Sequence, residues 1–291
     1  MRPGDHASIP KEALGIMTAR TLANSHPVLL GLLEPGLATL DVGCGPGTLT
    51  VEIARRVDPG AVVGMDTNPE MIQAAEEASP PGEVPNLVFY RGDIRESSWD
   101  AEFDLVNGAR MLQWIANAHL ALERMARAVR PDGLVVLLDY DHTRAAWSHP
   151  PAAWSRFYEA FLAWRAAGGL DNAMATRLAA MCAAAGLADV REIPRAETVR
   201  AGDADFFRAA GLWRMVIDSR GRQMVPAGYL TEPERVAALD AFTGWMQSQG
   251  ATQTLHETCV VATRPPQPTL SPISPGGEDK REGERIAVRG T

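Results

Sequence analysis

The chain has 291 residues, of which 46% are hydrophobic and 22% are charged, a balance typical of globular proteins. This length suffices for one large α/β domain with insertions or for two small domains. The formal net charge of −8 disfavours nucleic acid as a substrate, because an acidic surface repels phosphate backbones. No apolar run reaches the roughly 18 residues of a membrane-spanning helix, so we expect no membrane partner.

The N-terminal segment and the cysteines indicate the compartment. Residues 1–11 are polar and lack the apolar run of a signal peptide, so we expect a cytoplasmic protein. The three cysteines lie far apart without a CxxC pair, which favours reduced thiols over a disulfide framework or a zinc site. Because the sequence contains no dense cluster of Asp, Glu and His either, we predict no metal site. The oligomeric state stays open.

Short apolar runs alternate with helical patterns through the first half of the chain. Leu49, Ile53 and Val57 recur every four residues, which predicts a helix with one buried face after the first strand. Strands that are apolar on both faces fit a parallel sheet covered by helices, so the alternation predicts a doubly wound α/β sheet. The predicted strands are residues 38–42, 61–65, 87–90, 103–106 and 134–138, and the predicted helices are residues 49–57, 70–78 and about 122–129.

The second half of the chain has a mostly helical pattern. Two insertions, at about 145–185 and 203–248, carry aromatic and aliphatic side chains at helical spacing. Residues 190–193 and 254–262 are two further predicted strands. Because the first insertion begins directly after the strand ends, we expect the insertions to form a cap over them.

The first predicted strand runs into a turn with three glycines, Asp41-Val-Gly43-Cys-Gly45-Pro-Gly47. Glycines at a strand-to-helix turn let a ligand approach the backbone closely, because no Cβ stands in the way. The helix that follows offers free N–H groups at its N-terminus, near which an amino-acid carboxylate can lie. Three glycines within five residues in this context favour a ligand-binding loop over a plain tight turn.

Two aspartates end the second and third predicted strands. Asp66 follows the glycines by about 20 residues, where a carboxylate can accept hydrogen bonds from ribose hydroxyls. The alternative is a helix cap, for which Asn68 is better placed. Asp93 and Ile94 suit an adenine ring, with the acid accepting from the exocyclic amine and Ile94 packing on a face. Taken alone, Asp93 fits a turn residue better.

Together these segments resemble the class I S-adenosylmethionine-dependent methyltransferases. LDVGCGPG is similar to the family's first motif, VVGMDTNPEMI to its second and YRGDI to its third. FDLVNGARMLQWI and ALERMARAVRPDGLVVLLD resemble its fourth strand, helix and fifth strand. The closest resemblance is to the branch related to ubiquinone and menaquinone biosynthesis methyltransferases, over roughly residues 14–141. It implies a Rossmann-like sheet of seven strands, mostly parallel, with an antiparallel last strand.

The resemblance implies S-adenosylmethionine as the cofactor and assigns residues to its parts. Asp41 and the three glycines would surround the methionine part, Asp66 would hold the ribose, and Asp93 with Ile94 would hold the adenine. Three residues at the end of the fourth strand would face the sulfonium. The segment from Arg20 to Ser25 resembles the branch's helix near the cofactor. The implied cofactor site is Asp41, Gly43, Gly45, Gly47, Asp66, Thr67, Met71, Asp93, Ile94, Asn107, Gly108 and Ala109.

Two rival interpretations stay open. An NAD(P)-dependent oxidoreductase would use Asp66 equally well. However, the glycines are spaced GxGxG, Thr48 stands where GxGxxG has its third glycine, and Asp93 has no role in that class. The second rival is a catalytically inactive module that keeps the cofactor-binding fold, although every cofactor position is intact.

The aromatic insertions and the strand ends indicate the acceptor. We predict a small, apolar or aromatic metabolite, methylated on oxygen, nitrogen or carbon. His142, in Asp139-Tyr-Asp141-His142, is the predicted general base for an acceptor that must lose a proton, because histidine titrates near neutrality. Asp139 or Asp141 would orient its ring. A solvated loop histidine is an equal alternative.

The C-terminal composition gives a testable boundary. We expect one domain over residues 1–264 and a disordered tail over residues 265–291, where proline, glycine and mixed charge leave too little apolar surface to offset the entropy of ordering. A chain that ends at Arg264 should therefore keep the thermal midpoint and the cofactor affinity of the full chain, both measured by calorimetry. A midpoint lower by several degrees would show that the tail packs on the domain.

Overall fold

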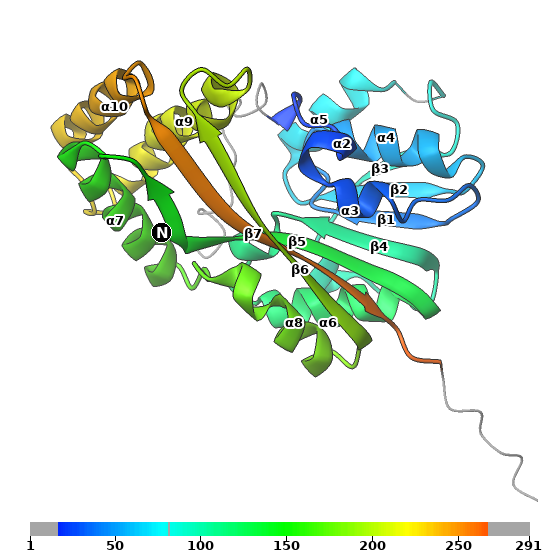
Figure 1. Ribbon diagram of the computed structural model, residues 1–291. Helices are drawn as coiled ribbons and strands as arrows, with labels where there is room; N and C mark the ends of the chain where they lie inside the picture. Colours follow the sequence, from blue (N-terminus) through cyan, green and yellow to red (C-terminus); the bar gives the residue numbers. More distant parts are fainter. Residues whose placement is uncertain (1–16, 81, 267–291) are drawn as a thin grey trace, which may run out of the picture.

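The structure is a computed structural model that describes residues 17–80 and 82–266. Its centre is a seven-stranded sheet in the order β3-β2-β1-β4-β5-β7-β6, with helices on both faces (Figure 1). The predicted Rossmann-like α/β sheet is thus confirmed. Almost all of the predicted tail lies outside the described residues. The strands are β1 (Thr39–Val42), β2 (Val62–Asp66), β3 (Leu87–Arg91), β4 (Phe103–Ala109), β5 (Val129–Trp147), β6 (Ala188–Arg200) and β7 (Thr252–Thr263).

Strand direction follows the expectation from the resemblance. The strands β1 to β5 pair in parallel, whereas β7 lies between β5 and β6 and is antiparallel to both. The first strand lies between β2 and β4, so the chain winds away from β1 in both directions. Open α/β sheets bind their ligands at the carboxyl ends of the strands at such a point. The topology therefore places a binding crevice beside the glycine turn.

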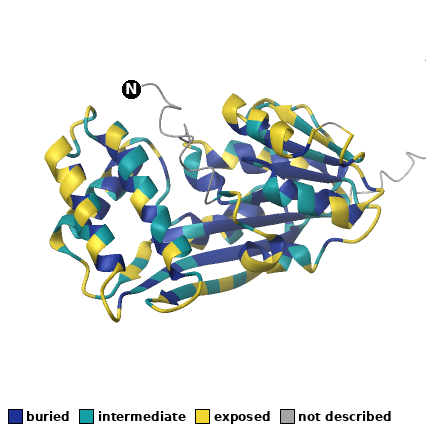
Figure 2. Cartoon of the chain, turned by 90° about the horizontal axis from the view of Figure 1, so that it is seen from above, coloured by how far each residue is buried: buried dark blue, intermediate teal, exposed yellow. Residues whose placement is uncertain are grey.

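Two helical layers cover the sheet. Leu22, Ile53 and Leu105 belong to the core on the face with the N-terminal helices and α4, and Leu122 and Leu178 belong to the core on the face with α6 and α8. Figure 2 shows the buried strands between helices whose outer surfaces are exposed. The helices are α2 (Leu22–Ser25), α3 (Pro27–Leu30), α4 (Thr48–Val57), α5 (Pro69–Ala78), α6 (Ala118–Ala128), α7 (Ala152–Ala167), α8 (Met174–Ala184), α9 (Phe206–Met224) and α10 (Glu232–Met246).

A helical cap lies on the extension of the three long strands. β5, β6 and β7 continue together past the parallel part of the sheet, and α7, α9 and α10 lie at that end (Figure 1). The cap has its own core, in which Trp154, Phe157 and Phe242 are at most 1% exposed. Most of the predicted cap aromatics therefore pack against one another.

The first predicted insertion divides between two places, which corrects the expectation that all of it caps the strand ends. Helix α7 belongs to the cap, but α8 packs on the sheet beside α6. Met174, Leu178 and Met181 bury their side chains in the core of the sheet, because their helical spacing gives α8 one continuous apolar face. Within residues 17–80 and 82–266, no helix is long and apolar enough to cross a membrane.

The position of α8 predicts a stability effect. Leu178 is fully buried, so replacing it with Ala should lower the free energy of unfolding by about 2–5 kcal/mol, through lost burial and a residual cavity. Val236→Ala, at a position of α10 that is 40% exposed, is the control and should change the free energy by less than about 0.5 kcal/mol. Urea denaturation measures both values. A Leu178→Ala protein as stable as the control variant would contradict the packing of α8 on the sheet.

Candidate functional site

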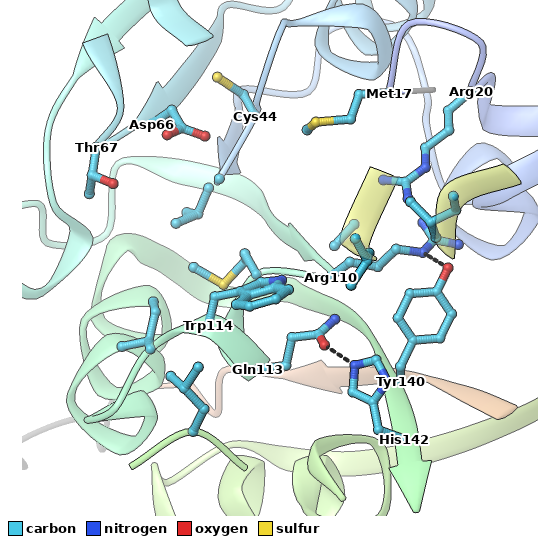
Figure 3. A pocket seen from close by; sticks show the side chains of 18 of the residues that line it. Met17, Arg20, Cys44, Asp66, Thr67, Arg110, Gln113, Trp114, Tyr140 and His142 are labelled. Atoms are coloured by element: carbon cyan, nitrogen blue, oxygen red, sulfur yellow. Dashed lines mark hydrogen bonds between the residues drawn. The ribbon is translucent and has the colours of Figure 1, made fainter. Parts of the chain in front are cut away.

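A cavity of about 370 Å³ lies at the carboxyl ends of β1, β2 and β4 and extends to the cap. Its wall combines the glycine turn, the ends of those strands, part of β5 and residues of α7 and α9. Figure 3 shows Asp66, Thr67 and Cys44 on one side and Arg20, Arg110 and Tyr140 on the other. The cavity thus connects the region of the predicted cofactor motifs with the cap.

The glycine turn adopts a backbone conformation that disfavours other residues. Gly43, Gly45 and Gly47 have φ values of +72°, +57° and +75°. A Cβ added to Gly43 would lie 2.7 Å from the Cβ of Met111. Met111 therefore packs closely against the turn, and it lines the cavity together with the backbone at Gly43 and Cys44.

The Asp66 carboxylate faces the cavity and is fixed by backbone groups. One oxygen accepts a hydrogen bond from the N–H of Gly45 at 2.9 Å, and the other accepts from the N–H of Asn68 at 2.9 Å. Each oxygen keeps one further lone pair for another donor. Burial raises the pKa of Asp66, and the backbone hydrogen bonds oppose that shift. Asn68 caps α5, with its side chain accepting from the N–H of Glu70, so the Asp66 oxygens can still accept two ligand hydroxyls.

Asp93 and Ile94 also line the cavity. The Asp93 carboxylate is paired with the guanidinium of Arg95, and its Oδ1 also accepts from the backbone N–H of Arg95 at 2.9 Å. The hydrogen bonds from Arg95 lower the pKa of Asp93, so the carboxylate stays charged. Ile94 is 2% exposed and offers an apolar surface beside it.

Asp41 and Asn107 belong to a buried hydrogen-bond chain behind the turn. The Asp41 carboxylate accepts from the Thr50 hydroxyl and from the Asn107 side-chain amide, both at 2.7 Å. The Oδ1 atom of Asn107 lies 3.2 Å from Nε2 of His26. Burial lowers the pKa of His26 to about 3, so the ring is neutral and can complete the chain without adding a charge.

His142 lies in an irregular part of β5, where the register with β7 shifts between Asp141 and Ala146. Its Nε2 is 2.6 Å from Oε1 of Gln113, which also accepts from Nη2 of Arg165 at 3.3 Å. Because that oxygen can only accept, His142 must carry its proton on Nε2. Burial lowers the pKa of His142 well below its usual value, with Arg165 as the second cause.

The expectation that Asp139 or Asp141 orients the His142 ring is wrong. The Asp139 carboxylate accepts from the backbone N–H groups of Gln113 and Tyr140, both at 3.0 Å. The Asp141 carboxylate accepts from Thr143 instead. Both acids are occupied by backbone and hydroxyl donors, so the polar neighbours of the ring are Gln113 at Nε2 and the Tyr158 hydroxyl, 3.5 Å from Nδ1.

The cavity brings together eight of the predicted site residues and leaves five outside its lining. Gly45 and Gly47 shape the turn, Asn107 holds Asp41, and Gly108 packs so closely that an added Cβ would lie 2.9 Å from Met125. Among the described residues, no group of three or more His, Cys, Asp or Glu is arranged to hold a metal ion. The residues in the lining are Asp41, Gly43, Asp66, Thr67, Asp93, Ile94, Ala109 and His142, and those outside it are Gly45, Gly47, Met71, Asn107 and Gly108.

Several polar and aromatic residues of the lining escaped the sequence analysis. The segment directly after β4 contributes most of them, because it turns back into the cavity as a short 3-10 helix. The sequence signal that could have identified this segment was its position at the end of a central strand, where open α/β sheets bind their ligands. The others come from elements whose meeting depends on tertiary packing. These residues are Arg110, Gln113, Trp114, Tyr140 and Arg220.

Comparisons with known proteins agree with this arrangement. A family described as a methyltransferase domain matches residues 33–177. Trans-aconitate 2-methyltransferase from Methylobacterium radiotolerans is 30% identical over 212 residues, which cover 72% of this chain and 78% of that protein. In several other curated relatives, the chain spans only 39% to 41% of their length.

Solved structures share the fold at low identity. YcgJ from Bacillus subtilis has a TM-score of 0.54 at 16% identity, with 89% of this chain and all of that chain covered. Phosphoethanolamine N-methyltransferase 2 from Haemonchus contortus, in complex with phosphomonomethylethanolamine and S-adenosylhomocysteine, has a TM-score of 0.51 at 15% identity, with 88% of this chain and 52% of that chain covered.

The family match extends over the glycine turn and the strands β1 to β5, and the relative from Methylobacterium radiotolerans is matched over most of its length. These findings do not favour the NAD(P)-dependent alternative. The chain therefore belongs to the class I S-adenosylmethionine-dependent methyltransferases and is an enzyme with S-adenosylmethionine as its cofactor.

Proposed function

We propose that this enzyme transfers the methyl group of S-adenosylmethionine to a small, apolar or aromatic metabolite held between the strand ends and the cap. The observation that carries the proposal is one continuous cavity, which runs from the glycine turn and Asp66 to aromatic residues of the cap. A small-molecule acceptor fits a site of this size that is bounded by protein on the cap side. The relative from Methylobacterium radiotolerans is likewise named for a small molecule.

The residues of the first half of the cavity fit the cofactor. We assign the ribose to Asp66, whose two oxygens each keep a free lone pair, and the adenine to Ile94 with Asp93. The backbone at Gly43 would adjoin the methionine part. The predicted residues outside the lining would act indirectly, by shaping the turn and by holding Asp41 and Asp66 in place.

The other half of the cavity fits an apolar or aromatic acceptor. Phe161 and Trp213 are the two large aromatic residues of the cap helices that reach it, and Trp114 adds a third ring from the segment after β4. The aliphatic lining consists of Ile115, Leu170, Leu212, Val216 and Leu255.

Positioning of the methyl donor and the acceptor supplies most of the acceleration of methyl transfer in such a site. Bound S-adenosylmethionine provides an activated methyl group, and holding an acceptor in line with it can lower the barrier by about 7–11 kcal/mol at best. The protein's own residues exclude water and orient the acceptor. Hydrogen bonds from His142 and Arg165 fix the Gln113 side chain in the cavity wall. The cap closes the other side of the cavity.

The ribose assignment predicts a loss of cofactor affinity. Asp66→Ala should weaken S-adenosylhomocysteine binding by roughly tenfold to a hundredfold, because hydrogen bonds to a charged group contribute about 1.5–3 kcal/mol. The control is Asp240→Ala, at an exposed position of α10, and should leave the dissociation constant unchanged. Isothermal titration calorimetry measures both variants. An unchanged constant for a folded Asp66→Ala protein would refute the assignment.

The role of His142 as general base stays a prediction and has a direct test. If His142 takes a proton from the acceptor, His142→Gln should lower kcat by about 10²–10⁴ and leave cofactor affinity unaltered. The exposed His119 on α6 provides the control variant His119→Gln. The assay measures S-adenosylhomocysteine formation with a panel of small phenols, enols and carbon acids. A loss below tenfold would show that His142 acts by holding Gln113 rather than as a base.

A further inference from the structure

The Trp114 ring lies against two cations at the cap end of the cavity. The Cζ atom of Arg165, on α7, is 4.4 Å from the centre of the ring, and the Cζ atom of Arg220, on α9, is 4.6 Å from it. Trp114 and Arg220 line the cavity, whereas Arg165 is fully buried next to them. We call these three residues the cap-end cluster.

Arg165 brings a positive charge that is held by neutral groups. Its guanidinium donates to the side chain of Asn172, to both oxygens of Gln113 and to the backbone oxygen of Asp171, at distances from 2.8 to 3.4 Å. Its Nη1 is buried and has no hydrogen-bond partner among the described residues. Burial lowers the pKa of Arg165 to about 10, so the guanidinium is still charged at neutral pH.

The acids near Arg165 compensate this charge only in part. Asp171 forms an ion pair with Arg177 at 2.9 Å. Burial raises the pKa of Asp139 to about 7, so this carboxyl group is protonated in a large share of the molecules at neutral pH. Positive charge therefore predominates beside Trp114, which makes an anion favourable there.

Arg220 places a second positive charge in the cavity lining. Its side chain is 5% exposed, and its Nη1 donates to Oε1 of Gln223 at 3.3 Å. Burial lowers the pKa of Arg220 to about 10, and the charge of Arg165 is the second cause. Both guanidiniums are therefore charged at neutral pH, and both would attract an anion beside Arg220.

Trp114 adds a neutral donor to this part of the lining. Figure 3 shows its indole ring in the cavity. The indole Nε1–H can only donate, and within residues 17–80 and 82–266 no group accepts from it. A cation and an N–H donor that share one stretch of wall match the two oxygens of a carboxylate.

The cap-end cluster is separate from the cations near the glycine turn. Arg20 and Arg110 line a smaller neighbouring pocket together with Glu197 and with Leu212 of α9. Arg220 follows Leu212 by eight residues in the same helix, which places it about 12 Å further along the helix axis. Figure 3 likewise shows Trp114 well apart from Arg20. The cations near the turn thus adjoin the methionine part of the cofactor, and the cap-end cluster lies in the acceptor half.

We propose that the methyl acceptor carries a carboxylate and that Arg220 and the indole N–H of Trp114 bind it. The proposal rests on the proposed function, which places a small apolar or aromatic acceptor in the same cavity. The apolar body of the acceptor packs against the rings of Phe161 and Trp213, and its anionic end lies at the cap-end cluster. Arg165 strengthens the attraction from behind the lining without contacting the acceptor.

The test compares acids with matched neutral amides. Benzoate, phenylacetate and 3-phenylpropanoate, and the corresponding amides, are titrated by calorimetry into the full chain saturated with S-adenosylhomocysteine. At least one acid should bind more tightly than its amide. Arg220→Gln should weaken the binding of that acid by roughly tenfold and leave that of the amide unchanged, because one charged hydrogen bond is lost.

Two further variants keep the test informative if Arg220→Gln fails to fold. Arg220→Lys keeps the charge and should keep part of the preference for the acid. Trp114→Phe keeps a ring but removes the N–H donor, and should lose part of that preference. The control Arg214→Gln removes the same charge from an exposed position of α9 and should keep the preference in full.

A second pair of ligands separates the acceptor from the cofactor. The affinities for S-adenosylhomocysteine and for 5′-methylthioadenosine, which lacks the amino-acid carboxylate, are measured for Arg220→Gln and for Arg20→Gln. Arg220→Gln should change neither affinity by more than twofold. Arg20→Gln should weaken S-adenosylhomocysteine alone and keep the preference of the acceptor half for the acid.

Three results would overturn the proposal. These are an equal affinity of the wild-type protein for acids and amides, an unchanged preference in folded Arg220→Gln or Trp114→Phe, and a loss in Arg220→Gln confined to S-adenosylhomocysteine, which would assign Arg220 to the cofactor. Failure of the proposed function is a separate result. In that case the protein would bind S-adenosylhomocysteine but transfer no methyl group to any small molecule, whatever its preference between acids and amides.

Discussion

The antiparallel pairing of β7 with β5 and β6 is the constraint on which the site depends. The β5–β7 ladder runs from Leu134 opposite Thr263 to Trp147 opposite Gln253, well past the last residues of the parallel strands. The cap core packs on this extension, and residues of α7 and α9 reach the cavity from there. Because inter-strand hydrogen bonds fix the register, the cap is held at a defined distance from the strand ends. The ladder thereby joins the cofactor half of the cavity to the acceptor half.

Buried polar groups determine the chemistry of the cavity wall. The Trp114 ring lies between two guanidiniums, with the Cζ atoms of Arg165 and Arg220 4.4 Å and 4.6 Å from its centre. Arg165 also holds Gln113, so one buried cation orders both a ring and an amide of the lining. Such networks are rigid when every member is satisfied. In this network, Nη1 of Arg165 is buried and has no hydrogen-bond partner among the described residues.

The sequence allowed the sheet, the glycine turn and the aspartates at the ends of β2 and β3 to be predicted, because each is encoded in a short contiguous segment. The length of β5 was underestimated, since its second half is polar and is a strand only through its pairing with β7. Helix α8 was placed in the cap, because a helical stripe shows that a face is buried but not against what. The meeting of Trp114, Arg165 and Arg220 depends on three distant segments, and no local pattern predicts it.

The central claim is that one cavity holds the cofactor in its strand half and directs the methyl group toward the cap. A crystal structure with S-adenosylhomocysteine tests it most directly. The account predicts the ribose hydroxyls on the Asp66 carboxylate, the adenine beside Ile94 and the sulfur facing the space enclosed by Trp114, Phe161 and Trp213. A sulfur atom that faces open solvent or a surface of lysines and arginines, with the aromatic space closed off from it, would contradict the account.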